Sequence, residues 1–196
     1  MGLSIVTAPS EYPVTLTEAK EYLRVDTSDF DDEITLIIAA ETAYAEIFTG
    51  CKFVPQTWDV YLDAFPTETE RQVISLPFST VISVDGVFYQ DSSGGDQEMD
   101  AELYVVDRAG RPARIGLALS ATWPQTSGNI NAVRIRVTTG DQDATVSPAV
   151  ADVPADVKLA ILVRVKASFD GGDETGRLME IADMYLKKHR VVVSLA

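Results

Sequence analysis

An early segment of the chain carries hydrophobic side chains at the spacing of an α-helix. Thr15 and Glu18 match the capping-box pattern S/T-x-x-E, in which each side chain accepts a hydrogen bond from the other residue's backbone amide. Hydrophobic side chains then recur every three or four residues, at Leu16, Ala19 and Leu23. The pattern predicts a helix over residues 15–24.

A longer helix is predicted to follow, up to Gly50. Ser28 or Asp29 is the expected N-cap, and the acidic residues after it lie in the first turn, where the helix dipole favours negative charge. The hydrophobic side chains that can line one side are Ile34, Ile37, Ile38, Ala45 and Phe48. Gly50 is the expected stop, because glycine readily adopts the left-handed conformation found at helix ends.

From Phe53 the pattern changes to the period of two that is typical of strands. Residues 133–137 (VRIRV) alternate cleanly, which places Arg134 and Arg136 on one face of a strand. Asp85-Gly86 is predicted to be a hairpin turn, and residues 91–96 (DSSGGD) a further turn. The expected strands lie at 58–63, 72–76, 81–84, 87–89, 103–106, 113–117 and 133–137.

Helical spacing returns after Pro154, a residue that suits the first turn of a helix. Residues 155–169 are hydrophobic nearly all round, so this helix needs contacts on several sides, and packing between subunits would supply them. An amphipathic helix is expected next, with its hydrophobic side formed by Leu178, Ile181, Ala182, Tyr185 and Leu186.

The expected fold class is therefore α+β. A helical core of about four helices, two N-terminal and two C-terminal, carries an inserted antiparallel β domain of about six short strands. The predicted boundaries give residues 1–52 and 141–196 to the helical core and residues 53–140 to the β-rich insertion.

The chain is acidic, and the charge is unevenly distributed. Its 196 residues contain 30 Asp and Glu against 16 Lys and Arg, a formal net charge of −14. Residues 1–50 carry ten acidic and two basic side chains, whereas residues 151–196 carry seven of each. This balance argues against indiscriminate nucleic-acid binding, which needs clustered Lys and Arg.

Few residues suit catalysis or metal binding. Cys51 and His189 are the chain's single cysteine and histidine, which excludes an internal disulfide and multi-histidine metal sites. The sequence contains no glycine-rich phosphate loop, no H-E-x-x-H and no G-x-S-x-G motif. The longest strongly apolar stretch, residues 34–40, is far shorter than the ~20 residues that a membrane helix needs. We therefore expect no catalytic residues, cofactor, metal or membrane association.

The C-terminus combines a basic cluster with a β-branched hydrophobic tail, VVVSL at residues 191–195. Such a tail is poorly suited to water. It either folds back onto the chain's own sheet or adds a strand or plug to a partner protein. We hypothesise the second.

An ordered set of segments along most of the chain carries a family resemblance. The N-terminal segments are LTEAKEYLRVD, DDEITLIIAAETAYAEIFTG, QTWDVYLDAFP and ISLPFSTVISVDGVFYQD, and the later ones are YVVD, the Trp123-Pro124 region, VRIRVTTG and VPADVKLAILVRV. The most specific features are the acidic helix ending in Thr49-Gly50, then Trp58, then Leu76-Pro77. Together they resemble the head-tail connector (adaptor) proteins of long-tailed bacteriophages, which have related neck proteins in phage-like gene transfer agents.

The resemblance implies a structural virion protein. Such proteins form a homo-oligomeric ring, commonly of twelve subunits, beneath the portal protein of the capsid. They join the portal to a stopper or tail-terminator protein, and DNA passes through the ring only as cargo. The implied location is the neck of a virion or phage-like particle that is assembled in the bacterial cytoplasm.

Two groups of residues are candidates for this role. The resemblance implies that the C-terminal segment reaches toward the portal, and the expected portal-binding residues are Lys187, Lys188, Arg190, Val191, Val192, Val193 and Leu195. A DNA channel lined with negative charge would repel phosphate and let DNA slide. The acidic residues expected to face it are Asp29, Asp31, Asp32, Glu33, Glu41 and Glu46.

Other functions stay open at this point. The acidic chain could act as a decoy that mimics DNA and blocks a DNA-binding enzyme, although the neutral last quarter argues against one continuous acidic face. It could also be another neck component, such as a stopper or tail terminator. An enzyme with a dispersed site is disfavoured by the absence of recognisable catalytic motifs.

Overall fold

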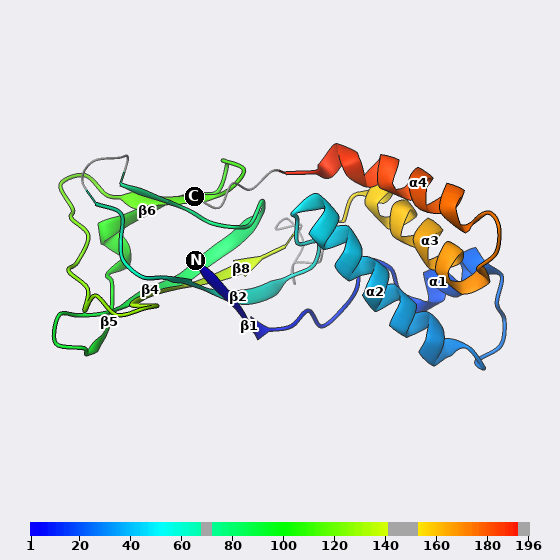
Figure 1. Cartoon of the computed structure of the whole chain (residues 1–196), viewed down its shortest axis with the longest axis horizontal. Helices are drawn as coiled ribbons and strands as arrows, with labels where there is room; N and C mark the ends of the chain where they lie inside the picture. The colour runs from blue at the N-terminus through cyan, green and yellow to red at the C-terminus, as the bar shows by residue number, and fades with distance from the viewer. Residues whose placement is uncertain (68–71, 141–152, 192–196) are drawn as a thin grey trace. The chain divides into compact units, whose positions relative to one another are not determined.

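A computed structural model of the chain describes residues 1–67, 72–140 and 153–191. The chain divides into two compact units, one of helices and one of strands, and each is described by itself. The helical unit contains described residues 9–54 and 153–191, and the β unit contains residues 1–8 and the described part of 55–140. The α+β class is confirmed, with helices and antiparallel sheets (Figure 1).

The helical unit contains four α-helices among its described residues. They are α1 (Leu16–Leu23), α2 (Asp31–Thr49), α3 (Ala155–Asp170) and α4 (Thr175–Leu186), and a short 3₁₀ turn, η2 (Lys187–His189), follows the last. The predicted capping box is confirmed at α1, where the Thr15 amide donates to Glu18 Oε2 at 2.7 Å and the Glu18 amide donates to Thr15 Oγ1 at 3.2 Å.

The two ends of α2 differ in how well the sequence predicted them. Gly50 ends the helix in the left-handed conformation, with φ 70° and its amide bound to the Glu46 carbonyl, as predicted. The predicted N-cap is wrong, because the helix begins after Phe30 and no side chain caps it. The Ser28 carbonyl, rather than its hydroxyl, closes the preceding turn by accepting from the Asp31 amide.

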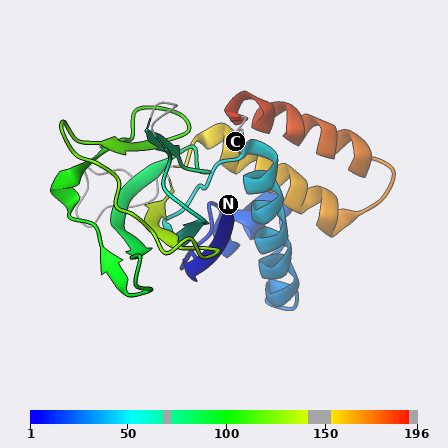
Figure 2. The same ribbon diagram turned by 60° about the vertical axis from the view of Figure 1, so that its left-hand side comes forward.

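Helix α3 lies at the centre of the helical unit and contacts α1, α2 and α4 (Figures 1 and 2). Its fully buried hydrophobic side chains include Val157, Ile161 and Val165, which pack with Ile34 and Ile38 of α2. The hydrophobic pattern of residues 155–169 is therefore satisfied largely within one chain, and it does not require packing between subunits.

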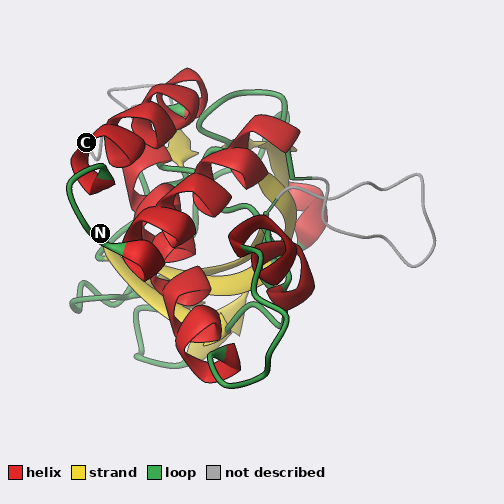
Figure 3. Cartoon of the chain, turned by 90° about the vertical axis from the view of Figure 1, so that its right-hand side faces the viewer, coloured by secondary structure: helices red, strands yellow, loops and turns green. Residues whose placement is uncertain are grey.

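The β unit contains two antiparallel sheets, and Figure 3 draws their strands in yellow. One has the strand order β1-β2-β8-β4-β5, and the other has the order β3-β7-β6. The strands are β1 (Gly2–Thr7), β2 (Gln56–Leu62), β3 (Val73–Ser75), β4 (Val81–Gln90), β5 (Asp96–Glu98), β6 (Tyr104–Asp107), β7 (Arg114–Leu117) and β8 (Val133–Thr139).

The alternation predicted for β8 is confirmed. Val133, Ile135 and Val137 are fully buried in the core of the β unit. Arg134 and Arg136 point to the opposite face, as side chains at odd and even positions of a strand must. The core therefore follows directly from the period of two in the sequence.

The hairpin predicted at Asp85-Gly86 is wrong, because both residues lie inside the continuous strand β4. The pairing of β4 with β8 shifts register between Val84 and Gly86, so the dipeptide forms a bulge. The Asp85 carboxylate stabilises it by accepting hydrogen bonds from the Ser83 and Thr138 hydroxyls. The predicted turn at residues 91–96 is real and joins β4 to β5.

The predicted grouping of residues 1–52 with the helices also needs correction. Residues 2–7 form β1, which pairs antiparallel with β2 from Gly2 opposite Tyr61 to Thr7 opposite Thr57. The first eight residues therefore belong to the β unit. Most of the β1 side chains are exposed, so the strand is held mainly by its backbone hydrogen bonds, which leave no burial pattern in the sequence.

Candidate interaction surfaces

The basic end of the helical unit, residues 187–191, is held by contacts to backbone groups. The Val191 amide donates to the Thr49 carbonyl at 2.7 Å, and Cys51 Sγ lies 3.3 Å from the His189 carbonyl oxygen. A Cβ atom at Gly50 would lie 2.8 Å from the Val191 carbonyl oxygen, so only glycine permits this approach. The segment after α4 is thus held against the turn that ends α2.

A side-chain contact adds to this anchor. His189 Nε2 lies 2.9 Å from Asp156 Oδ1, and Lys188 Nζ lies 3.9 Å from Asp156 Oδ2. The hydrogen bond with His189 is the main reason that the pKa of Asp156 lies below its usual range. Asp156 stands in the first turn of α3, so the anchor joins the end of α4 to the beginning of α3.

The expected portal-binding residues fall partly on this end. Lys187, Lys188 and Arg190 are exposed, and Val191 is half-buried at the anchor. Lys188 Nζ lies 5.2 Å from the Tyr185 ring centre, and the Arg190 guanidinium lies 5.8 Å from that of Phe48. The remaining three members, Val192, Val193 and Leu195, lie outside the described residues.

The expected channel-facing acids do not form one group. Asp29, Asp32 and Glu33 are exposed around the beginning of α2, where their charges favour the positive end of the helix dipole. Asp31 is half-buried and forms an ion pair with Lys20 at 2.5 Å. Glu46 forms an ion pair with Lys52 at 2.7 Å and accepts a hydrogen bond from the Phe53 amide.

Glu41 lies in the interior of the helical unit, 9% exposed, rather than on an open surface. Its Oε2 accepts from Arg164 Nε at 2.6 Å, and its Oε1 accepts from the Ser168 hydroxyl at 2.6 Å. Arg164 also donates to Asp183 Oδ1 at 2.9 Å, and its guanidinium lies 3.5 Å from the centre of the Tyr44 ring. These contacts show that Glu41 is a structural group that joins helices.

The spacing of Glu41 along the sequence indicates its burial, although its charge alone favours a surface position. Glu41 stands seven residues after Ile34 and four before Ala45, and both of those residues are fully buried. This spacing places all three on one side of the helix. A buried carboxylate needs a partner, and Arg164 stands within the otherwise hydrophobic run of α3.

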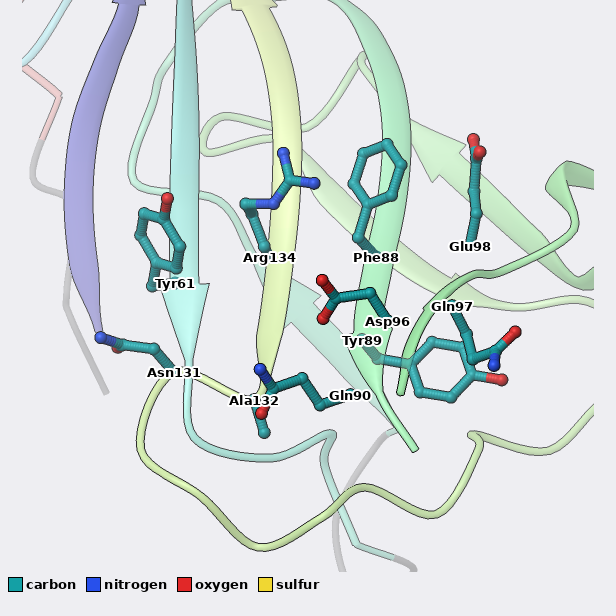
Figure 4. Close-up of a pocket in the computed structure, with 10 residues that line it drawn as sticks. All are labelled: Tyr61, Phe88, Tyr89, Gln90, Asp96, Gln97, Glu98, Asn131, Ala132 and Arg134. Atoms are coloured by element: carbon teal, nitrogen blue, oxygen red, sulfur yellow. The ribbon is translucent and has the colours of Figure 1, made fainter. Parts of the chain in front are cut away.

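The β unit has an open hollow of about 410 Å³ on the face that carries the β8 arginines (Figure 4). The Arg134 guanidinium lies 4.2 Å from the centre of the Phe88 ring, between strands β2 and β4. The lining residues also include Tyr61, Gln90, Glu98 and Asn131.

The arginines beside the hollow are engaged by a buried carboxylate. Arg136 donates to both oxygens of Asp59, at 2.9 and 3.0 Å, and Arg134 donates to Asp59 Oδ2 at 3.3 Å. These contacts, led by the hydrogen bonds from Arg136, hold the pKa of Asp59 below its usual range. The arrangement joins strands β2 and β8 through charge, and it engages both arginines, so this face is poorly suited to binding a phosphate.

Two further properties concern the described residues only. No three or more His, Cys, Asp or Glu side chains converge there in a way that would hold a metal ion. None of the helices is both long enough and apolar enough to cross a bilayer.

The comparisons with known proteins identify relatives of the fold. No protein-family model and no curated protein matches the chain. A chain in a solved structure of a "virion of native gene transfer agent (GTA) particle" has a TM-score of 0.75 and 22% identity, over 100% of this chain and 98% of that chain.

Two neck structures give similar results at 20% identity and the same coverage. One is the neck of an empty GTA particle computed with C6 symmetry, with a TM-score of 0.73. The other is the neck of a native GTA particle computed with C12 symmetry, with a TM-score of 0.64. At this level of identity the likeness shows that the fold is shared along the whole chain.

Proposed function

We propose that this chain is a structural neck component, a head-tail connector that assembles as a ring below the portal and joins the capsid to the tail. The observation that carries the proposal is that this chain matches each of the three solved chains over nearly the full length of both partners. Two of those solved chains come from particle necks. The ordered segments that resemble connector proteins support the same role independently. The neck structures with C6 and C12 symmetry are consistent with a ring, for which we propose twelve subunits.

Within this proposal, the basic end of the helical unit binds the portal protein. The exposed members Lys187, Lys188 and Arg190 surround the point where the tail begins, and the anchor at Val191 fixes that point. A tail that starts from a fixed position loses less conformational freedom when it binds than one that starts from a free end. We propose that Val192, Val193 and Leu195 complete this contact.

We further propose that exposed acids at the beginning of α2 face the DNA channel. The proposal keeps Asp29, Asp32 and Glu33, because their carboxylates are exposed. Glu41, Glu46 and Asp31 are already engaged by Arg164, Lys52 and Lys20, so their charges contribute less to repelling phosphate.

The test is deletion of the gene in the bacterium that makes the particle, followed by electron microscopy. We expect DNA-filled heads and free tails, and intact particles when the full chain is restored. A variant that ends at Arg190 should fold but fail to join heads to tails, whereas D29N/D32N particles should assemble and release DNA more slowly. Normal tailed particles after deletion would refute the connector role.

A stopper or tail terminator predicts a different location. Antibody labelling of intact particles, combined with capture of the purified portal protein by the chain, separates these roles. A connector binds the portal directly. A chain that labels the neck but binds only tail proteins would be a stopper or terminator instead.

A further inference from the structure

Helix α2 carries a hydrophobic stripe that the helical unit leaves uncovered. Leu36, Ala40, Ala43 and Ile47 are all exposed and follow one another at spacings of four, three and four residues. Leu36 is 71% exposed and Ile47 is 83% exposed, although both are large and hydrophobic. This is the spacing of a seam that packs against another helix, and we call these four residues the α2 seam.

The α2 seam lies opposite the buried side of its own helix. Ile34, Ile38 and Ala45 point into the core of the helical unit, and at 3.6 residues per turn the seam is about half a turn away from them. The seam therefore cannot be covered by α3, which packs on the buried side. Isolated exposed hydrophobic residues are ordinary, but a continuous stripe of them marks an interface.

Helix α4 carries a second exposed stripe of a different character. Arg177, Glu180 and Met184 of α4 and its C-cap residue Lys187 are exposed and follow at spacings of three, four and three residues, and we call them the α4 stripe. Met184 is 61% exposed, and Lys187 and Lys188 give the C-terminal end of the stripe a positive charge. This stripe also lies opposite its helix's buried side, which is formed by Leu178, Ala182 and Leu186.

The two stripes are complementary when the helices run antiparallel. Placing Leu36 opposite Met184 brings Glu33 opposite Lys187, because each pair lies one turn further along its helix. Opposite charges and opposite helix-dipole ends then meet at the N-terminus of α2 and the C-terminus of α4. In the same register, the two small alanines of the α2 seam face the long side chains of Glu180 and Arg177, whose aliphatic parts can cover them.

Within one chain the two stripes cannot meet. Helices α2 and α4 both pack on α3 (Figure 1). Each stripe is exposed and lies on the side of its helix opposite the residues that are buried in the core. A contact between the stripes must therefore join two copies of the chain. Because it uses a different surface on each copy, repetition of the contact produces a ring or a filament rather than a closed dimer.

We propose that the α2 seam of one copy packs antiparallel against the α4 stripe of the next copy, and that this contact joins the subunits of the ring. The inference rests on the proposed ring and assigns its subunit interface. In this contact Glu33 and Lys187 lie between subunits, which leaves Asp29 and Asp32 for the channel and Lys188 and Arg190 for the portal. Glu33 and Lys187 set the register, and Leu36 and Met184 form the centre of the hydrophobic contact. Ile47, one turn beyond the alanines, packs over the turn that precedes α4.

The first test is disulfide crosslinking of the full chain. Two cysteines bridge only if their Cα atoms lie within about 7 Å of each other. The L36C/M184C variant should give a ladder of covalent multimers under oxidation. T35C/M184C is the matched control, because Thr35 is exposed on the same turn but points to another side of α2, and it should stay uncrosslinked. Cys51 is buried and can remain in both variants.

The second test reverses the charges that set the register. E33K and K187E should each weaken self-association by about tenfold, measured by sedimentation, since each places like charges together. The E33K/K187E double variant should recover to within about threefold of the wild-type chain, because the pair is restored with opposite sign. Circular dichroism of each variant should match that of the wild-type chain, since both residues are exposed.

Two results would overturn the inference. One is a chain that forms multimers without the L36C/M184C crosslink and without response to either charge reversal. The other is a chain that stays monomeric in sedimentation at every protein concentration measured. Antibody labelling of the particle neck tests the proposed function separately. Neck labelling combined with either of these results therefore refutes this interface and leaves the connector role intact.

Discussion

Replacement of Arg164 by methionine should destabilise the helical unit strongly. Arg164 is only 7% exposed, and its guanidinium binds Glu41 and Asp183 while it stacks on Tyr44. The R164M variant leaves the buried carboxylate of Glu41 with the Ser168 hydroxyl as its remaining side-chain partner. Breaking one side of a buried ion pair costs about 3–5 kcal/mol, because an uncompensated charge remains in the interior.

The contribution of each partner can be ranked from its exposure. The side chain of Glu41 is 12% exposed and that of Asp183 is 33% exposed. When Arg164 is removed, water can therefore replace much of the hydrogen bonding that Asp183 loses but little of the hydrogen bonding that Glu41 loses. Most of the cost should therefore come from Glu41. For a unit of this size, 1 kcal/mol corresponds to a melting shift of about 4–8 °C, so R164M should lower Tm by at least about 12 °C.

The assay is urea unfolding of the full chain, followed by far-UV circular dichroism, which reports mainly the helices. The matched control is E41M/R164M, which removes both charges together and should regain much of the lost stability, because no buried charge is left unpaired. A loss below about 1 kcal/mol for R164M would refute the reasoning. So would an E41M/R164M chain that is no more stable than R164M.

Three further substitutions test individual contacts. G50A should destabilise the chain by about 1–2 kcal/mol in urea unfolding, because a side chain there is strained by the left-handed backbone and meets a carbonyl oxygen. D156N should be less stable than the wild-type chain at neutral pH. Because His189 lowers the pKa of Asp156, the carboxylate's contribution to stability is present above the unfolded pKa and is lost as pH falls through the folded pKa. The stabilities of D156N and the wild-type chain should therefore converge in acid. The same difference in stability at every pH would contradict this. D59N should lower stability by about 2–4 kcal/mol in thermal unfolding, because it removes the partner of Arg136, and D59E serves as the charge-preserving control.

Local patterns in the sequence predicted the helices well. The capping box at Thr15, the stop at Gly50 and the period of two in β8 each depend on neighbours within a few residues, so the sequence alone carries them. The α+β class followed from the change of period near Phe53. The order of segments then led to the resemblance to connector proteins and their relatives in gene transfer agents, and the fold is shared with chains of GTA particle and neck structures.

The missed features depend on partners far along the chain. β1 is stabilised by pairing with β2, fifty or more residues away, and its exposed side chains give no burial pattern. Asp85-Gly86 suits both a turn and a bulge, and the choice is made by the hydroxyl of Thr138 on another strand. Glu41 looked like a surface acid because its partner, Arg164, lies in a different helix.

The anchor after α4 has a mechanical consequence. A pull on the chain beyond Val191 is first resisted by the hydrogen bond between its amide and the Thr49 carbonyl. That bond passes the load to the end of α2, so the force is shared by two helices before the last turn of α4 can unwind. Together with the link from His189 to Asp156 in α3, it distributes tension over most of the helical unit. A tail attached in this way can bear strain without unravelling the helix from which it emerges.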